Sequence, residues 1–326
     1  MKHISILVLN DCVLASIADP RYMFTAINQF LTQMGKNELF KVQLVGMEKE
    51  VKLNGNVFSI HPDILAHEVK KTDLIVIPAL SGDIKLCIEK NEKFIPWIQQ
   101  QYEAGAEVAS LCIGAFMLAS TGLLEGKKCS THWLFADLFR EMFPKVELVD
   151  DKIVTEQNRL YSSGGASSYW NLLLYLVEKY TNREMAILAS KFFAIDFGRD
   201  SQSGFILFQG QKNHNDESIL KAQQFIEENY VEKISIDFLA EKYNLGKRSF
   251  ERRFKNATKN TVNEYIQRVK IEAAKKNFEI SRKNIHEVMF EIGYNDVKSF
   301  REVFKKITGH TPIEYRNKYQ KTSLNA

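Results

Sequence analysis

The carboxyl-terminal third of this chain contains one helical motif twice, and this repeat limits the folds available to the region more than any other feature. At an offset of 50 residues, Ser249-Phe250 is matched by Ser299-Phe300. The match continues through Phe254-Lys255 and Phe304-Lys305, Thr258 and Thr308, Thr261 and Thr311, and Glu264-Tyr265 and Glu314-Tyr315. Two copies at a fixed spacing indicate two similar structural units in tandem.

Each copy predicts two short helices joined by a turn. A capping residue, Ser235 or Asn284, precedes apolar residues spaced three and four apart. A turn containing Gly246 or Gly293 follows, and a second helix comes after the turn. Two short helices joined by a tight turn with glycine form a helix-turn-helix.

The second helix of each copy predicts a charged, exposed face. Its two phenylalanines lie four residues apart, so both should be buried against the preceding helix. The exposed stripe then consists of Arg248, Glu251, Arg252 and Lys255 in the first copy, and of Lys298, Arg301, Glu302 and Lys305 in the second. Arginine can hold guanine with two hydrogen bonds, and a carboxylate can accept one from cytosine. The lysines Lys255, Lys259, Lys305 and Lys306 are suited to phosphate contacts.

The distribution of charge favours an acidic partner for the same region. Residues 1–214 contain 22 Lys and Arg against 24 Asp and Glu, whereas residues 215–326 contain 22 against 16. A basic surface is often no more than a solvated face. Two equally spaced stripes on two helix-turn-helix copies instead favour double-stranded DNA.

The first two hundred residues predict a mostly parallel sheet covered by helices. Apolar runs of buried-strand type occupy 4–9, 41–46, 73–79 and 106–112. Amphipathic stretches occupy 20–34, 91–103, 114–121, 132–142, 168–180 and 183–194. Residues 209–217 have no apolar content, so we expect one domain over 1–208 and an all-α domain over 209–326.

Cys112 is the one candidate nucleophile. It lies between an expected strand and an expected helix, where a sharp turn would expose a thiol at the helix amino terminus. The alternative is a small apolar residue at a strand end, the commoner role of such a cysteine. The four cysteines and seven histidines form no metal-binding pattern, and no phosphate-binding glycine motif is present, so we expect neither a metal nor a cofactor.

Residues 218–320 resemble the DNA-binding region of AraC/XylS-type transcription regulators. The resemblance is carried by IDFLAEKYNLGKRSFERRFK in the first copy and IGYNDVKSFREVFKKITGHTPIEYR in the second. It implies a long helix over about 261–278 that sets both second helices into successive major grooves. It also implies that the base-reading positions are Arg248, Glu251 and Arg252, and Val297, Lys298 and Arg301.

Residues 3–195 resemble the ThiJ/PfpI branch of class I glutamine amidotransferase-like domains, as fused to AraC-type domains. The main carrier is ASLCIGAFMLASTGLLEGKKCSTHW, supported by SSGGASSYWNLLLYLVEKY. The resemblance implies a flavodoxin-like α/β sandwich with a cysteine elbow. Active members have His after the cysteine, where this chain has Ile113, and Glu where it has Ser16. The usual glycine pair is also missing from 79–82, so we expect Cys112 to be a degenerate elbow position without catalysis.

We expect this domain to bind a small effector. Ligands of open α/β sheets lie beyond the carboxyl ends of the strands, here at loops 10–20, 79–84, 112–115 and 162–168. The expected contacts are Cys112, Ile113, Asp19 and Ser163. The resemblance implies a small polar, nitrogen-containing metabolite and a homodimer.

The sequence therefore predicts a cytoplasmic, sequence-specific regulator of a promoter region with a ligand-sensing domain. No run of 18 apolar residues is present, so no membrane association is expected. Three alternatives stay open: a cysteine-dependent hydrolase or amidase with a DNA-binding tail, a redox sensor that acts through Cys112, and a nucleoid-type binder without sequence preference.

Overall fold

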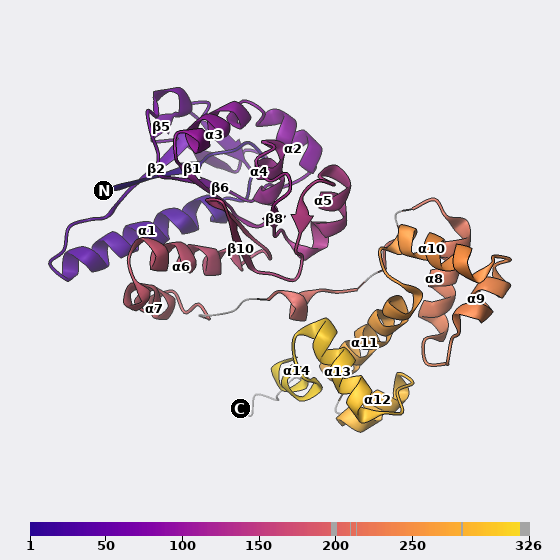
Figure 1. Ribbon diagram of the computed structural model, residues 1–326. Coiled ribbons are helices and arrows are strands. Elements are labelled where there is room, and N and C mark those ends of the chain that lie inside the picture. Colours follow the sequence, from indigo (N-terminus) through magenta and orange to yellow (C-terminus); the bar gives the residue numbers. More distant parts are fainter. Residues whose placement is uncertain (197–200, 209, 213, 282, 320–326) are drawn as a thin grey trace. The chain divides into compact units, whose positions relative to one another are not determined.

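The chain forms two compact units, the first spanning Met1–Gln202 and the second beginning at Ser203 (Figure 1). The computed structural model describes residues 1–196, 201–208, 210–212, 214–281 and 283–319. The division between the units, after Gln202, lies a few residues before the predicted boundary at 208. The difference arises because Gln202 is hydrogen-bonded inside the first unit, whereas Phe208 packs against the core of the second.

The first unit is built on a seven-stranded sheet in the order β10-β11-β7-β6-β1-β2-β5. All neighbouring strands are parallel except β10 and β11. Their bounds are β1 Lys2–Leu7, β2 Phe40–Gly46, β5 Ile64–Leu65, β6 Leu74–Ile77, β7 Glu107–Ser110, β10 Val154–Gln157 and β11 Leu160–Ser163. The four predicted strands are β1, β2, β6 and β7, and the central strand β6 is buried throughout, as expected for a sheet covered on both faces.

Helices cover both faces of this sheet (Figure 1). One side carries α1 Ala15–Gln33, α6 Tyr169–Tyr180 and α7 Arg183–Phe192, and the other carries α2 Ile84–Lys90, α3 Phe94–Glu103, α4 Ala115–Ser120 and α5 Ala136–Met142. Small pairs of strands, β3 Val51–Leu53 with β4 Phe58–Ile60 and β8 Lys128–Cys129 with β9 Glu147–Leu148, lie outside the main sheet. The predicted flavodoxin-like α/β sandwich is confirmed.

Helix α1 begins at Ala15, earlier than the predicted start at residue 20. In the structure the Ser16 and Ile17 N–H groups already donate to the carbonyls of Val13 and Leu14, so Pro20 lies within the helix.

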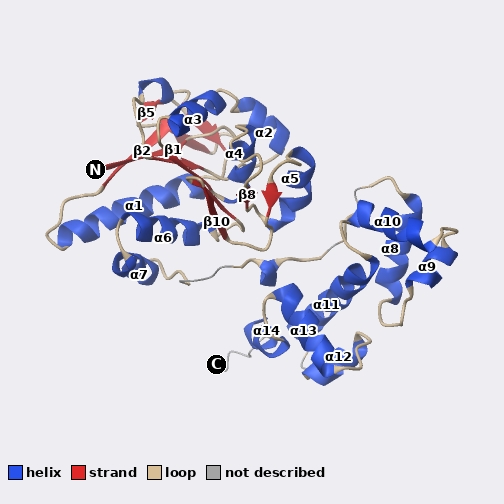
Figure 2. Ribbon diagram, in the orientation of Figure 1, coloured by secondary structure: helices blue, strands red, loops and turns tan. Residues whose placement is uncertain are grey.

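In the second unit, helices are the regular elements among the described residues, and loops and turns join them (Figure 2). The helices are α8 Glu217–Asn229, α9 Ile236–Lys242, α10 Lys247–Thr258, α11 Val262–Ile280, α12 Ile285–Glu291, α13 Val297–Thr308 and α14 Pro312–Tyr319. Helices α9 and α10 form the first helix-turn-helix, and α12 and α13 form the second. The predicted double helix-turn-helix and the long connecting helix, α11, are therefore present.

The sequence repeat is also a repeat of hydrogen bonds. Thr258 Oγ1 donates to the carbonyl of Phe254 at 2.8 Å, and Thr308 Oγ1 donates to that of Phe304 at the same distance. Tyr265 donates to Glu227 and Tyr315 to Glu279, both at 2.6 Å. Tyr265 thus links α11 to α8, and Tyr315 links α14 to α11. In each copy, the helix that follows the helix-turn-helix is bonded to the helix that precedes it.

We call α10 and α13, the second helices of the two copies, the recognition helices. They end in the same backbone conformation but with different residues. The C-cap of α13 is Gly309, with φ 75°, and the C-cap of α10 is Lys259, with φ 56°. Glycine adopts this left-handed conformation without strain, whereas a residue with a Cβ atom does so at a cost of about 1–2 kcal/mol. The first copy therefore carries strain that the second lacks.

Replacing Lys259 with glycine should stabilise the helical unit by about 1 kcal/mol, because the strain at this C-cap is removed. Urea unfolding of the full chain, followed by circular dichroism at 222 nm, measures the change. Gly309→Ala is the matched control and should destabilise by a similar amount, since nothing except Ser203 lies within 4 Å of the added Cβ. A destabilising Lys259→Gly would contradict this explanation.

Candidate functional site

The exposed face of α10 is the one predicted from the spacing of its phenylalanines. Phe250 and Phe254 are fully buried in the core of the first helix-turn-helix. The predicted DNA-facing residues of this helix are all exposed, namely Arg248, Glu251, Arg252 and Lys255. Their side chains are free to enter a groove.

Helix α13 repeats this arrangement with one difference. Phe300 and Phe304 are fully buried, and the predicted residues Lys298, Arg301 and Lys305 are exposed. Val297, also predicted to read bases, is half-buried and packs against the core of the second helix-turn-helix. Only part of its side chain is therefore open to a partner.

Arg253 lies beside the predicted stripe and has a different role. Its guanidinium donates two hydrogen bonds to Asp216, at 2.8 and 2.7 Å. Asp216 is the N-cap of α8, and the ion pair with Arg253 lowers the pKa of its carboxyl group. This contact fixes α10 on α8, and sequence reasoning missed it because the partners are 37 residues apart.

Cys112 lies at a sharp turn between β7 and α4. Its φ of 54° is left-handed, and a short helical turn, Cys112–Gly114, leads into the helix. A Cβ atom at Gly114 would lie 2.4 Å from the carbonyl oxygen of Pro78, so only glycine fits there. The predicted cysteine elbow is therefore present as a backbone geometry.

The predicted ligand residues meet around this elbow. The Cys112 N–H donates to Ser163 Oγ at 3.2 Å, and Thr131 Oγ1 donates to the Cys112 carbonyl at 3.2 Å. Asp19 accepts a 2.6 Å hydrogen bond from the hydroxyl group of Tyr169, whose pKa is raised by burial, by Asp19 and, to a smaller extent, by Cys112. Ile113 is the next residue of the elbow and is 8% exposed. Thr131 and Tyr169 were not singled out from the sequence, although Tyr169 lies in the quoted SSGGASSYW segment.

The thiol of Cys112 is poorly suited to nucleophilic attack. The residue is 5% exposed, and burial raises its thiol pKa to about 12. No hydrogen bond joins Cys112 to His132 in the described part of the chain. The His132 Nδ1 atom instead accepts from the Leu134 N–H at 3.1 Å, and burial lowers the pKa of this imidazole. The thiol is therefore neutral at pH 7, and among the described residues His132 is not placed to accept its proton.

Backbone donors that could stabilise an oxyanion are also occupied. The Ala79 N–H donates to Ser16 Oγ at 2.9 Å, and the Ser81 N–H donates to the Asp11 carbonyl at 2.7 Å. Ser16 is fully buried at the position where the resemblance expects glutamate. The side chain thus organises the loop and does not hold a proton for Cys112.

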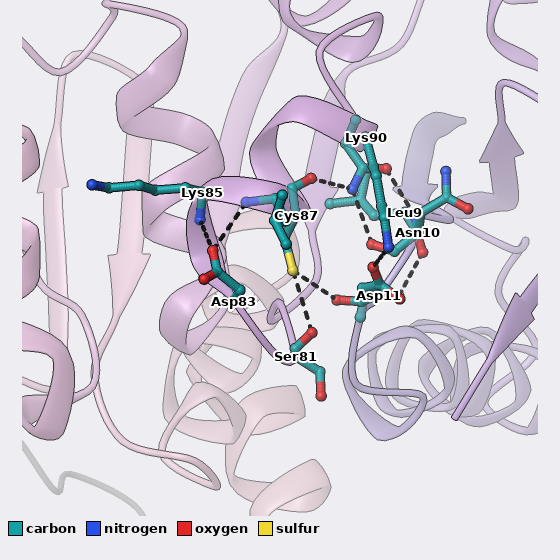
Figure 3. A network of polar contacts seen from close by, with 11 residues as sticks. Leu9, Asn10, Asp11, Ser81, Asp83, Lys85, Cys87 and Lys90 are labelled. Atoms are coloured by element: carbon teal, nitrogen blue, oxygen red, sulfur yellow. Dashed lines mark hydrogen bonds and ion pairs between the residues drawn. The ribbon is translucent and has the colours of Figure 1, made fainter. Parts of the chain in front are cut away.

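A second cysteine, Cys87, helps to join two of the predicted loops (Figure 3). Its thiol lies 3.3 Å from the Ser81 carbonyl and 3.8 Å from the Asp11 carbonyl. Lys90 forms an ion pair with Asp11 in the same network. Burial raises the pKa of the Cys87 thiol, so this residue is a neutral structural donor.

Family profiles match both units. Residues 24–179 match the DJ-1/PfpI family, and residues 239–318 match a helix-turn-helix domain. The HTH-type transcriptional regulator GbdR of Pseudomonas aeruginosa is 23% identical over 316 residues, which cover 97% of this chain and 84% of that protein. The two profiles give a DJ-1/PfpI domain followed by a helix-turn-helix domain, and along nearly its whole length the chain is similar to a transcriptional regulator.

Two further proteins are similar to part of this chain. The isonitrile hydratase of Pseudomonas putida is 26% identical over 150 residues, covering 45% of this chain and 63% of the enzyme. A solved AraC family transcriptional regulator from Pseudomonas putida superposes with a TM-score of 0.51 at 17% identity, covering 59% of this chain and all of that one. The structural likeness establishes the fold alone.

Neither a membrane-spanning helix nor a metal-binding group is present among the described residues. No helix among the described residues is long and apolar enough to cross a membrane. Within the same residues, no group of three or more His, Cys, Asp or Glu side chains is arranged to hold a metal ion.

The raised pKa of Cys112 predicts a distinctive alkylation profile. With a pKa of about 12, the thiolate fraction at pH 8 is roughly one in ten thousand, and it rises about tenfold per pH unit. Iodoacetamide labelling followed by peptide-resolved mass spectrometry should therefore show a rate that still climbs between pH 9 and 10. Free cysteine, with a pKa of about 8.5, is the reference and levels off in this range. A plateau for Cys112 below pH 9 would mean an activated thiol.

Proposed function

We propose that this protein is a sequence-specific DNA-binding regulator whose first unit senses a small polar metabolite. The observation that carries the proposal is the pair of recognition helices, α10 and α13, each with two buried phenylalanines and an exposed basic face. The two recognition helices suit an asymmetric DNA site, because their exposed residues differ. Arg248 of α10 stands where α13 has Lys298.

In this proposal the DNA-contacting residues divide into two groups. Arg248, Glu251, Arg252, Lys298 and Arg301 read bases, together with the exposed part of Val297. Lys255 and Lys305 lie further along the same faces and contact phosphates, which orient the protein without reading sequence. The AraC-type fold of the unit and the name of its relative GbdR, a transcriptional regulator, support this assignment.

We propose binding, and not catalysis, at the elbow of the first unit. The Cys112 thiol is neutral, no base is hydrogen-bonded to it, and the loop N–H groups of Ala79 and Ser81 already have acceptors. The same raised pKa disfavours a peroxide sensor, which needs a thiolate. An isonitrile hydratase is among the similar proteins. The proposal that this chain does not catalyse therefore rests on its own elbow residues and not on its similarity to other proteins.

The effector in this proposal is a small polar molecule with nitrogen. Asp19 supplies a carboxylate, Ser163 a hydroxyl group, and Cys112 and Ile113 an apolar wall. We also propose that the protein acts in the cytoplasm as a homodimer, as the family resemblance implies.

DNA affinity measured against salt tests the regulator function. The full chain should bind DNA from upstream of its own gene roughly a thousandfold more tightly than scrambled DNA. Arg248→Ala should cost about 1–3 kcal/mol on the cognate site only, because a base contact is lost. Lys306→Ala is the matched control, since losing a phosphate contact weakens binding to both DNAs and flattens the salt dependence. Equal binding of the wild type to both DNAs would contradict sequence-specific regulation.

A stability screen tests the sensing function. Amino acids, amines and betaines should include a compound that raises the melting temperature, since a ligand at a hundred times its Kd stabilises by about 2.7 kcal/mol. The gain should be lost in Asp19→Asn and kept in Asp137→Asn, which alters an exposed carboxylate of the same unit. A ligand that stabilises both variants equally would bind elsewhere.

A further inference from the structure

Gln202, the last residue of the first unit, is buried in the loops around the elbow. Its side chain is 1% exposed, and its amide nitrogen lies 3.0 Å from the Thr131 carbonyl, 2.8 Å from that of Asp150 and 3.2 Å from that of Lys152. Its backbone N–H donates to the Asp151 carbonyl at 2.8 Å. The end of the unit is thus held by the side chain and the backbone of Gln202, together with the Ser201 hydroxyl group, which donates to the Asp151 carbonyl at 3.0 Å.

The contacts of Gln202 lie next to Thr131 and Ser163, the two residues whose hydroxyl groups are hydrogen-bonded to the Cys112 backbone. Thr131, whose carbonyl accepts from Gln202, donates its hydroxyl group to the Cys112 carbonyl. Ser163, which accepts from the Cys112 N–H, precedes Gly164, and a Cβ atom at Gly164 would lie 2.2 Å from the Gln202 amide nitrogen. A shift of the elbow loops therefore moves the residues on which Gln202 rests.

The other end of the Gln202 amide has no partner among the described residues. Its oxygen, Oε1, is buried and accepts no hydrogen bond from any of them. The amide cannot be turned to satisfy it, because the nitrogen faces three carbonyl oxygens. A buried carbonyl without a donor is unfavourable, so an N–H or O–H group brought to this oxygen would stabilise the arrangement.

The chain after Gln202 is attached to both helix-turn-helix copies of the second unit. We call residues 203–208 the strap. Its start, Ser203–Phe205, packs against α13, and the Phe205 ring meets that of Tyr319 with centroids 6.4 Å apart. Its end, Phe208, packs on Tyr265 in the core of the first copy.

The middle of the strap is anchored on the long helix α11. Lys275, 2% exposed, donates to the Ile206 carbonyl at 2.6 Å and pairs with Glu272 at 3.0 Å. Glu272 in turn accepts from the Phe208 N–H at 3.1 Å. Displacing the strap would therefore break its hydrogen bonds with Lys275 and Glu272 of α11.

We propose that Gln202 is the positioning residue that couples the elbow site to the DNA-binding unit, and that the effector donates a hydrogen bond to its Oε1 atom. Filling or emptying the elbow shifts Gln202, which pulls on or releases the strap that follows it in the chain. This inference rests on the proposed function, since it assumes that the first unit controls DNA binding. It also narrows the effector to molecules with an N–H or O–H donor.

The coupling can be tested without knowing the effector, because coupling between two sites is reciprocal. DNA bound to the second unit must then alter the elbow. Hydrogen–deuterium exchange of the full chain, with and without saturating upstream DNA, should show a change of about fivefold or more in peptides covering 128–134 and 160–168.

Three variants make the result specific. Gln202→Met removes the fastening amide, and Lys275→Met releases the strap from within the other unit, so both should abolish the DNA-dependent change while still binding DNA. Gln101→Met is the matched control: Gln101 is a buried glutamine of the first unit, 4% exposed, that bonds Thr72 and Val69. It should keep the wild-type response.

The outcomes separate the two proposals. Upstream DNA that binds no better than scrambled DNA would overturn the proposed function and this inference with it. Specific DNA binding with unchanged elbow exchange in the wild type would overturn the inference alone. A full response in Gln202→Met would do the same, and if that variant does not fold, a full response in Lys275→Met decides equally.

Discussion

Buried backbone groups need hydrogen-bond partners, and in both units the side chains that supply them fix the geometry of the functional elements. At the elbow, Ser163 and Thr131 take up the N–H and carbonyl groups that the left-handed turn at Cys112 leaves outside the sheet. At the ends of the recognition helices, the hydroxyl groups of Thr258 and Thr308 accept from the Asn260 and His310 N–H groups, each at 3.2 Å. These side chains thus pair backbone groups that lie beyond the regular elements.

The recognition helices owe their open faces to the core beneath them. Two fully buried phenylalanines per helix fix its rotation, so the two residues that follow the first phenylalanine of each pair face outward. Arg253 shows how sharply this works, because it follows Arg252 and yet turns toward Asp216 on α8. One step along the helix separates a residue free to contact DNA from one that holds the helix in place.

The elbow combines a strained cysteine turn with a buried thiol whose pKa is raised. The backbone still presents Cys112 at a strained turn above a glycine that no other residue could replace. Around it, however, polar groups pair with one another: Asp19 with Tyr169, Ser16 with Ala79. Because the Ala79 N–H is already paired with Ser16, it is not available to stabilise a developing negative charge.

Local patterns in the sequence determined the elements of this protein. The strands, most of the helices, the repeat and the exposed stripes follow from spacings of a few residues, and the turn at Cys112 follows from one short segment. The start of α1 lies at Ala15 and not at residue 20, because an amphipathic pattern does not show where the first helical turn begins. Only the tertiary structure decided the pairing of Arg253 with Asp216, the place of Tyr169 beside Asp19, and the burial of Gln202 against Thr131. These contacts join residues 37, 150 and 71 positions apart, and no periodicity in a chain encodes which distant groups its folding will bring together.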